Sequence, residues 1–207
     1  GDQFGFAASI SGDAVLIGAP DDIRDGLKTG SAYLYGRNEG GTNNWGQIKK
    51  LVSSNGGGGD EFGASVSIDG ENLIVGAHFY DFSGVDTGAA YIFARNQGGT
   101  NNWGELKSIV SPTPLGNNQL GYAVSISKDI TVTGLPFAGP NKDNRFGTAF
   151  LFGQDEGGAA NWGTIQEMKR SDLSLDDYFG TAAAVADNTV VIGANLDDDN
   201  GNASGSA

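Results

Sequence analysis

The chain has 207 residues, of which 38% are hydrophobic and 10% aromatic, and its net charge at neutral pH is −13. This composition can support a folded core, while the acidity argues against nucleic-acid binding, because phosphate contacts need Lys and Arg. Cysteine is absent, which excludes disulfides and thiolate metal sites, and no apolar run approaches the ~18 residues of a membrane span.

Taken in chain order, the first residues predict four short strands. FAASIS at 6–11 alternates in polarity and turns through Ser-Gly-Asp into AVLIGA at 14–19. A polar loop at 20–30 leads to SAYLYG at 31–36, and the loop RNEGGTNNWG leads to QIKKLV at 47–52. Short strands separated by Gly, Asn and Asp at this spacing are typical of an all-β array.

The same pattern recurs along the chain. The glycines of a Phe-Gly or Leu-Gly pair are 58 or 59 residues apart, at Gly5, Gly63, Gly121 and Gly180. A second glycine follows each of them thirteen residues later, at Gly18, Gly76, Gly134 and Gly193. A Trp-Gly pair keeps this period at Trp45, Trp103 and Trp162. A fixed period with several constant landmarks indicates a repeat architecture.

Four antiparallel strands per repeat are typical of a propeller blade. We therefore predict an all-β fold, a β-propeller of four-stranded antiparallel blades, with about three and a half blades in this chain. The blade repeats are expected at residues 1–59, 60–117 and 118–176, followed by an incomplete blade at 177–207.

Phe-Gly, followed by Gly-Ala-Pro at 18–20 and by Gly-x-Ala-Tyr-x-Phe at 88–93, resembles the FG-GAP repeat, the blade of the integrin α-subunit β-propeller. The chain is closer still to the shortened repeats of bacterial cell-surface proteins. The resemblance implies an extracellular or cell-surface module for adhesion or ligand recognition. Integrin-type blades hold calcium between their first two strands, but here that connection is as short as Ser-Gly-Asp, too short for the six to eight oxygens that calcium needs.

The fourth repeat is expected to contain two strands, so a half ring would expose apolar faces and a strand edge. We favour a fragment of a longer protein. The alternative is a structural subunit of an extracellular fibre or sheath, in which neighbouring copies complete the half blade. The implied partners are therefore the missing part of the same protein or further copies of it.

Acidic residues gather in the loops between the second and third strands, which share one end of the blades with the links from the fourth strand to the next first strand. The predicted ligand-binding residues are Asp21, Asp25, Asp81, Asp86 and Asp143. The best calcium candidate is formed by Asp197, Asp199 and the carbonyl of Gly201; calcium is possible and no other cofactor is expected. The alternative interpretation is turn chemistry, since Asp and Asn cap their own backbone.

Aromatic residues invite two interpretations. The repeated Trp side chains could stack on sugar rings, but their recurrence in every complete unit favours packing within each blade. The alternating aromatics of the third strands are predicted to form the core between blades: Tyr33, Tyr35, Tyr91, Phe93, Phe150 and Phe152. His78, the single histidine, is predicted to be a turn residue.

The sequence favours a protein that is not an enzyme. There is no Cys nucleophile, and no Gly-x-Ser-x-Gly motif lies near His78. The expected partner is a protein or carbohydrate ligand at a surface. A carbohydrate-active propeller enzyme remains a further alternative, because the many acidic residues could supply a pair of facing carboxylates.

Overall fold

The computed structural model of the chain describes residues 1–141, 144–171, 175–199 and 201–207. These residues form sixteen strands, and no helix among them is long and apolar enough to cross a membrane. The predicted all-β class is therefore confirmed.

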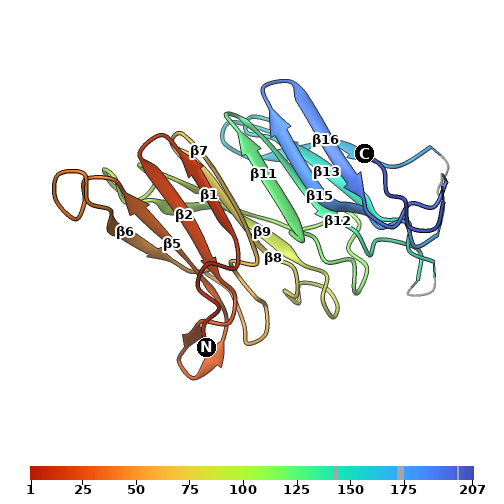
Figure 1. Ribbon diagram of the computed structural model, residues 1–207, viewed down its shortest axis with the longest axis horizontal. Coiled ribbons are helices and arrows are strands. Elements are labelled where there is room, and N and C mark those ends of the chain that lie inside the picture. The colour runs from red at the N-terminus through yellow and green to blue at the C-terminus, as the bar shows by residue number, and fades with distance from the viewer. Residues whose placement is uncertain (142–143, 172–174, 200) are drawn as a thin grey trace.

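Three four-stranded antiparallel sheets and one two-stranded sheet follow each other along the chain (Figure 1). Sheet 1 contains β1 (Ala8–Ser11), β2 (Ala14–Ala19), β5 (Ser31–Gly36) and β6 (Gly46–Leu51). Sheet 2 contains β7 (Ser65–Asp69), β8 (Asn72–Ala77), β9 (Ala89–Ala94) and β10 (Gly104–Ile109). Sheet 3 contains β11 (Ala123–Ser127), β12 (Ile130–Leu135), β13 (Thr148–Gly153) and β14 (Gly163–Met168). Sheet 4 contains β15 (Phe179–Ala186) and β16 (Thr189–Ala194).

The loop at 20–30 is more ordered than the sequence indicated. It contains a small hairpin of β3 (Ile23–Arg24) and β4 (Leu27–Lys28). The two residues between these strands, Asp25 and Gly26, both have positive φ, at 52° and 83°. Asp-Gly is a favoured pair in such a two-residue turn, because both residues tolerate the left-handed conformation. The prediction of a polar loop did not include this hairpin, because the surrounding polar residues hid the turn signal.

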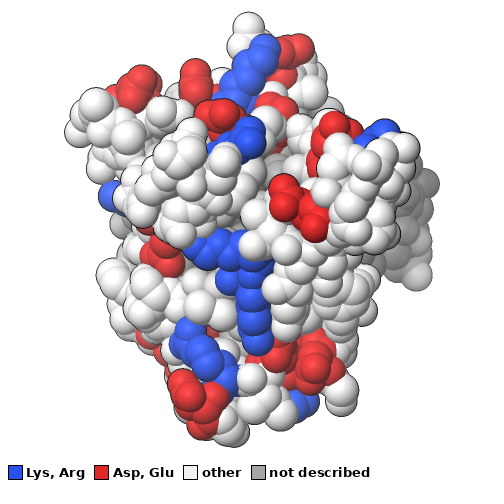
Figure 2. Space-filling view, turned by 90° about the vertical axis from the view of Figure 1, so that its left-hand side faces the viewer, with Lys and Arg blue, Asp and Glu red and all other residues white. Residues whose placement is uncertain are grey.

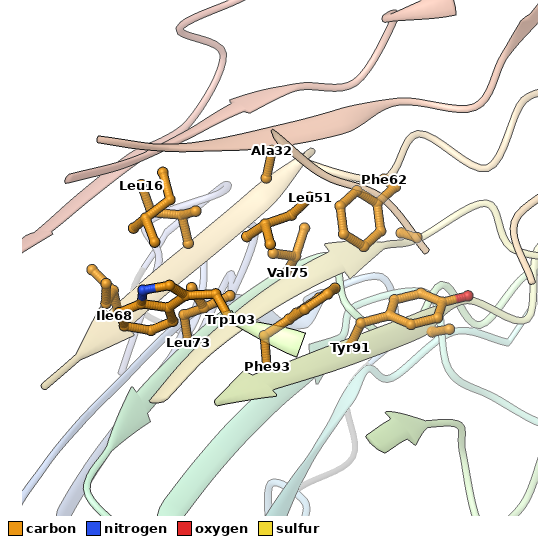
Figure 3. Close-up of a cluster of buried hydrophobic side chains, with 13 residues drawn as sticks. Leu16, Ala32, Leu51, Phe62, Ile68, Leu73, Val75, Tyr91, Phe93 and Trp103 are labelled. Carbon is orange, nitrogen blue, oxygen red and sulfur yellow. The ribbon is translucent and has the colours of Figure 1, made fainter. Parts of the chain in front are cut away.

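Successive sheets pack face to face, and we call their contacts junction 1 (sheets 1 and 2), junction 2 (sheets 2 and 3) and junction 3 (sheets 3 and 4). Each junction has its own hydrophobic cluster. In junction 1, Leu16 and Leu51 of sheet 1 lie against Val75 and Phe93 of sheet 2 (Figure 3). The core is therefore divided into layers between sheets, as expected for stacked repeats, each of which buries its apolar face on its neighbour.

The first strands of the four sheets, β1, β7, β11 and β15, contact one another in that order. Serine side chains join them. The hydroxyl of Ser9 accepts the N–H of Ile68, and the hydroxyl of Ser67 accepts the N–H of Ile126, both at 3.1 Å. Neighbouring first strands are thus held by side-chain acceptors rather than by a continuous backbone ladder.

Glycines near the ends of the second strands let adjacent sheets approach closely. A Cβ added to Gly76 of sheet 2 would lie 2.1 Å from the carbonyl oxygen of Gly121. One added to Gly18 would lie 1.9 Å from the carbonyl oxygen of Gly63. The repeated Phe-Gly and Gly-Ala-x motifs therefore meet across each junction, where no larger residue fits without moving the backbone.

The outer faces of sheets 1 and 4 are left uncovered. Ile10 is 65% exposed, whereas the equivalent Ile68 of sheet 2 is 5% exposed. Val191 of sheet 4 is 51% exposed, whereas the equivalent Ile74 is fully buried. Sheets 1 and 4 lie at opposite ends of the molecule (Figure 1), so the described chain is an open, partial propeller.

The open side of sheet 1 also carries charge. Figure 2 shows Lys and Arg side chains across the middle of this side of the molecule, with Asp and Glu around them. The ion pairs of sheet 1 and its loops join Lys28 to Asp21, Arg37 to Asp13 and Lys50 to Asp22, at 2.8–2.9 Å. Because these cations are paired, the side is less basic than its lysines and arginines alone would make it.

The predicted aromatic core between blades is confirmed for four of the six residues of the third strands and is wrong for Tyr33 and Tyr35, because no described sheet covers that side of sheet 1. Tyr91 is fully buried and Phe93, Phe150 and Phe152 are each 3% exposed, all within the clusters of junctions 1 and 2. Tyr33 and Tyr35 are half-buried on the uncovered side of sheet 1, where Phe4 packs edge-on against both rings.

Candidate ligand-recognition face

One backbone position recurs in all four units, at the start of the loop that follows each second strand. Its N–H donates to the carbonyl oxygen three residues earlier, and its carbonyl oxygen accepts the N–H of the glycine that closes the loop. The four residues at this position, which we call the loop position, are Asp22, Tyr80, Ala138 and Asp197. The backbone contacts of this position are the same in each unit, and its side chain differs from unit to unit.

Two further positions lie beside it in the links that connect the sheets. The first is the residue three before the glycine of the Phe-Gly or Leu-Gly pair, and the second lies seven residues further upstream. They hold Asp60 and Ser53 in junction 1, Asn118 and Ser111 in junction 2, and Asp177 and Arg170 in junction 3. Loop and link positions therefore form a set of three at each junction, on one end of the sheets.

In junction 1 this set is filled by a phenol ring. The amide of Asn55 donates to the hydroxyl of Tyr80 at 2.8 Å, and the hydroxyl of Tyr91 donates to the amide oxygen of Asn55 at 2.9 Å. The rings of Tyr80 and Tyr91 meet edge to face, with centroids 6.2 Å apart. Asp60 accepts the N–H of Gly57, but burial raises the pKa of its carboxyl group.

In junction 2 the same set is small and neutral. Ala138 takes the place of Tyr80, and a cavity of about 400 Å³ opens beside it. Ser111, Asn118 and Phe150 line the cavity. The loop position is bonded as in junction 1 but carries no ring, and the loop that follows Ala138 also lines the empty space.

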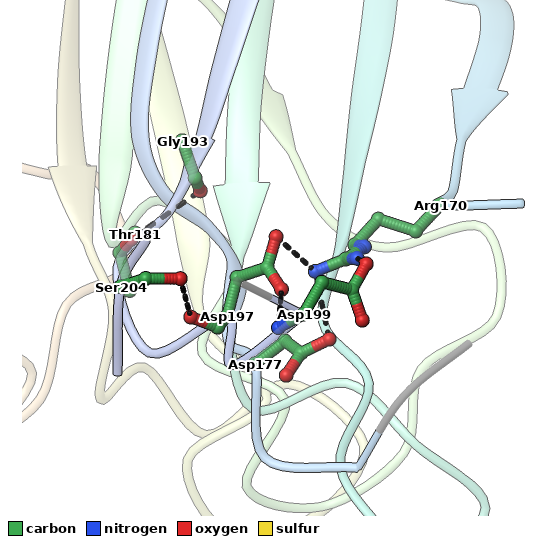
Figure 4. A network of polar contacts seen from close by, with 7 residues as sticks. All are labelled: Arg170, Asp177, Thr181, Gly193, Asp197, Asp199 and Ser204. Atoms are coloured by element: carbon green, nitrogen blue, oxygen red, sulfur yellow. Dashed lines mark hydrogen bonds and ion pairs between the residues drawn. The ribbon is translucent and has the colours of Figure 1, made fainter. Parts of the chain in front are cut away.

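In junction 3 the set is ionic (Figure 4). The guanidinium group of Arg170 contacts Asp177 at 2.7 Å, Asp197 at 2.9 Å and Asp199 at 3.0 Å. The side chains of Asp177 and Asp197 are almost fully buried, whereas that of Asp199 is half exposed.

The two buried carboxyl groups differ in their proton affinity. Burial raises the pKa of Asp177, although the positive charge of Arg170 opposes this. A hydrogen bond from Ser206 and the N–H of Asp199 lower the pKa of Asp197. Arg170 is thus the cation around which the carboxylates gather, and without it two buried negative charges would face each other.

The predicted calcium residues lie in this cluster only in part. Asp197 and Asp199 both contact Arg170, and the carboxylate oxygens of Asp177, Asp197 and Asp198 come within 4.8 Å of one another. The carbonyl of Gly201 accepts the N–H of Ser204 at 3.0 Å. Calcium binding stays a prediction, and the geometry adds Asp177 and Arg170 to the residues on which it would depend.

The four predicted ligand-binding aspartates that the structure describes do not converge on one site. Asp21 accepts hydrogen bonds from Gln3 and Lys28, which lower the pKa of its carboxyl group. Asp25 is an exposed residue of the β3–β4 turn. Asp81 accepts the N–H of Asp86 at 2.8 Å, so this pair has the turn chemistry that was the alternative interpretation. Asp143 lies outside the described residues, and ligand binding by this group stays a prediction.

At the opposite end of the sheets, two of the Trp residues are packed as expected, but in clusters shared with the neighbouring sheet instead of within one blade. Trp103 is 4% exposed and Trp162 2% exposed; they belong to the clusters of junctions 1 and 2 rather than to a core of their own blade. Trp45, on the uncovered sheet 1, is partly exposed and lies under the guanidinium group of Arg37.

His78 is buried to a degree that its sequence context did not indicate. Its ring packs on Phe79 and Tyr122, and its Nε2 atom lies 3.6 Å from a carboxylate oxygen of Glu61. Burial lowers the pKa of the imidazole to about 4, so the histidine is neutral at physiological pH.

Sequence reasoning missed the roles of Tyr80, Ala138, Asn118 and Arg170. Their signal was present in the repeat itself, because each stands at a fixed distance from a landmark glycine. Comparing the four units column by column would have shown one position that changes from acid to phenol to methyl while its glycine neighbours stay the same.

The stacked four-stranded sheets and the shared loop frame define a propeller-type repeat protein. The FG-GAP repeat family matches residues 1–35, 45–93 and 162–207, which is more than half of the chain. The chain belongs to the FG-GAP repeat family. A search of curated proteins finds no match to it.

Proposed function

We propose that this protein is a non-enzymatic recognition module, extracellular or at the cell surface, that binds a protein or carbohydrate ligand through its loop face and serves in adhesion. The observation that carries the proposal is the loop position. One backbone frame presents Asp22, Tyr80, Ala138 and Asp197 at four successive places.

A rigid scaffold with variable loop side chains is the usual arrangement of binding surfaces. Here the frame is fixed by backbone hydrogen bonds and by glycine contacts between sheets. On this constant frame the side chains differ, so that junction 1 contains a phenol, junction 2 a cavity and junction 3 an ionic cluster. Such a surface can recognise a ligand at several points without a change of fold.

The experiment compares the two ends of the sheets. Purified protein is titrated against immobilised extracellular-matrix proteins and surface polysaccharides. The variant D25N/D81N removes two exposed acids from the loop face, and E39Q/E156Q removes two exposed acids from the opposite end. Both variants change the net charge by the same amount, so non-specific electrostatic effects cancel in the comparison.

We expect the loop-face variant to weaken binding and the matched control to leave it unchanged. A ligand whose binding is lost only in E39Q/E156Q would move recognition to the opposite end and overturn the proposal. Binding to no member of the panel would also count against it. Release of reducing sugars from the polysaccharides would replace the non-enzymatic part of the proposal with the carbohydrate-active alternative.

A structural subunit of a fibre or sheath is the second candidate, and the uncovered apolar faces favour it. Ile10 on sheet 1 and Val191 on sheet 4 are both more than half exposed, although their counterparts in the other sheets are buried. Light scattering on the purified chain tests this candidate. Concentration-dependent growth of long assemblies would support it, and a monomer at all concentrations would reject it.

A further inference from the structure

The cavity of junction 2 lies where junction 1 contains the ring of Tyr80. Ala138 and Tyr80 occupy the same backbone position, each with an N–H donated three residues back and a carbonyl bonded to the glycine before the third strand. The links have the same length, so Thr113 stands where junction 1 has Asn55. Phe150 likewise stands where junction 1 has Tyr91.

The walls of the cavity suit an aromatic ring. Leu135, Ala138, Phe146 and Phe150 line it, and the ring of Phe150 corresponds to the one that Tyr80 contacts edge to face in junction 1. A volume of about 400 Å³ falls within the range of small-ligand sites, which combine apolar walls with a few polar groups.

A polar group faces this space. Asn118 is 5% exposed and lines the cavity. Within the described part of the chain its side chain forms no hydrogen bond, whereas its counterpart Asp60 accepts the N–H of Gly57 and its counterpart Asp177 accepts from Arg170. Among the described residues, Asn118 is not one of those with a buried unpartnered side-chain atom, so its amide is open to the cavity, where a ligand hydroxyl can take the place of water.

We propose that the cavity beside Ala138 binds a phenol ring, supplied by a tyrosine side chain of the protein that the loop face recognises. The ring packs on Phe150, and its hydroxyl group reaches Asn118 or Thr113. The cavity opens to the surface beside Leu115, which is 49% exposed, and Pro140. The opening lets the backbone of the partner stay outside. This inference rests on the proposed function for the identity of the partner, but the ring site itself does not.

The experiment uses p-cresol, which is the tyrosine side chain alone, and N-acetyl-tyrosinamide, which adds a backbone. Binding to the intact chain is followed by calorimetry and by NMR shifts of Leu115 and Leu135. We expect one saturable site for each probe. The variant A138Y reproduces the side chain of junction 1 and should weaken binding of both probes at least about tenfold.

The neighbouring junction offers the matched variants. Y80A opens the corresponding space in junction 1 and should raise the number of p-cresol sites from one to two, whereas Y80F keeps the ring and should leave one. If Y80A does not fold, the comparison of wild type, A138Y and Y80F is sufficient, with circular dichroism showing that each is folded.

Three results would overturn the inference: no saturable binding of p-cresol, equal binding by folded A138Y, or binding of p-cresol without N-acetyl-tyrosinamide. Its failure can be separated from that of the proposed function. If the protein binds a surface ligand but not p-cresol, the ring site alone is rejected. A p-cresol site without any surface ligand rejects the recognition module alone.

Discussion

Replacing Arg170 by Ser should expose the energetic role of the ionic cluster in junction 3. Serine is the residue that junctions 1 and 2 have at this position, so the substitution is compatible with the backbone. It removes the guanidinium group that lies 2.7 Å from Asp177 and 2.9 Å from Asp197. The two carboxylates then stay buried together without a cation.

The magnitude follows from burial. The side chain of Asp177 is 1% exposed and that of Arg170 is 12% exposed. Removing one partner of a buried ion pair costs about 3–5 kcal/mol, and we expect about 3 kcal/mol here because Arg170 keeps some contact with water. Asp199, which is 51% exposed, adds less than about 1 kcal/mol.

The pH effect follows from the loss of a cation beside both buried carboxyl groups: Arg170 contributes to the lowered pKa of Asp197 and opposes the rise that burial causes in the pKa of Asp177. A carboxyl group with a raised folded-state pKa favours the folded protein at low pH, and this contribution is lost as the pH rises. Without Arg170 both pKa values should rise. The loss of stability in R170S relative to the wild type should therefore be largest near neutral pH and become smaller as the pH falls below about 5.

The assay is urea unfolding followed by Trp fluorescence at pH 7 and pH 4.5. The control is the triple variant R170S/D177N/D197A, which gives junction 3 the side chains of junction 2. It leaves no buried charge and should recover at least about half of the lost stability. The reasoning is refuted if R170S lies within about 1 kcal/mol of the wild type, or if the triple variant is less stable than R170S.

Three other substitutions test the packing. Gly76→Ala places a Cβ 2.1 Å from the carbonyl oxygen of Gly121, in the link to the next sheet, and should lower the free energy of unfolding by at least about 2 kcal/mol. Gly193→Ala, whose Cβ meets nothing closer than 3.3 Å, should lower it less in the same denaturation assay. Trp103→Ala should cost about 3–5 kcal/mol, but Trp45→Ala less than about 1 kcal/mol, because only Trp103 is buried between sheets; equal losses would contradict the layered core. The folded state favours the neutral form of His78, whose pKa is lowered to about 4. As the pH falls from 7 to 4, the wild type should therefore lose up to about 3 kcal/mol more stability than His78→Asn. Parallel pH profiles of the two proteins would show that the imidazole is not desolvated.

Much of the fold could be read from periodic residues, because they mark contacts that every repeat makes. The spacing of Gly5, Gly63, Gly121 and Gly180 gave the repeat, and the alternation of Tyr91 and Phe93 gave the face of the third strand that packs in junction 1. The hairpin in the loop at 20–30 was missed because it occurs in one unit. A feature without a period leaves only a local signal, here Asp-Gly, which also fits an irregular loop.

The candidate site was predictable in location and not in composition. Acidic loops correctly indicated the end of the sheets at which Asp197 lies, but which carboxylates meet there depends on how the link from sheet 3 crosses the loop of sheet 4. Arg170 is 27 residues before Asp197 in the chain, and no local pattern connects the two. The same reason hid the relation between Ala138 and the cavity.

The sequence by itself determined the strand order within each sheet and the close glycine contacts between sheets, since both depend on residues that repeat at fixed spacing. Only the tertiary structure decided what each junction contains: a phenol ring at Tyr80, a cavity at Ala138 and an ion cluster around Arg170. The physical reason is that these contents are set by side chains from different units, whose contact energies depend on burial and distance rather than on position in the chain.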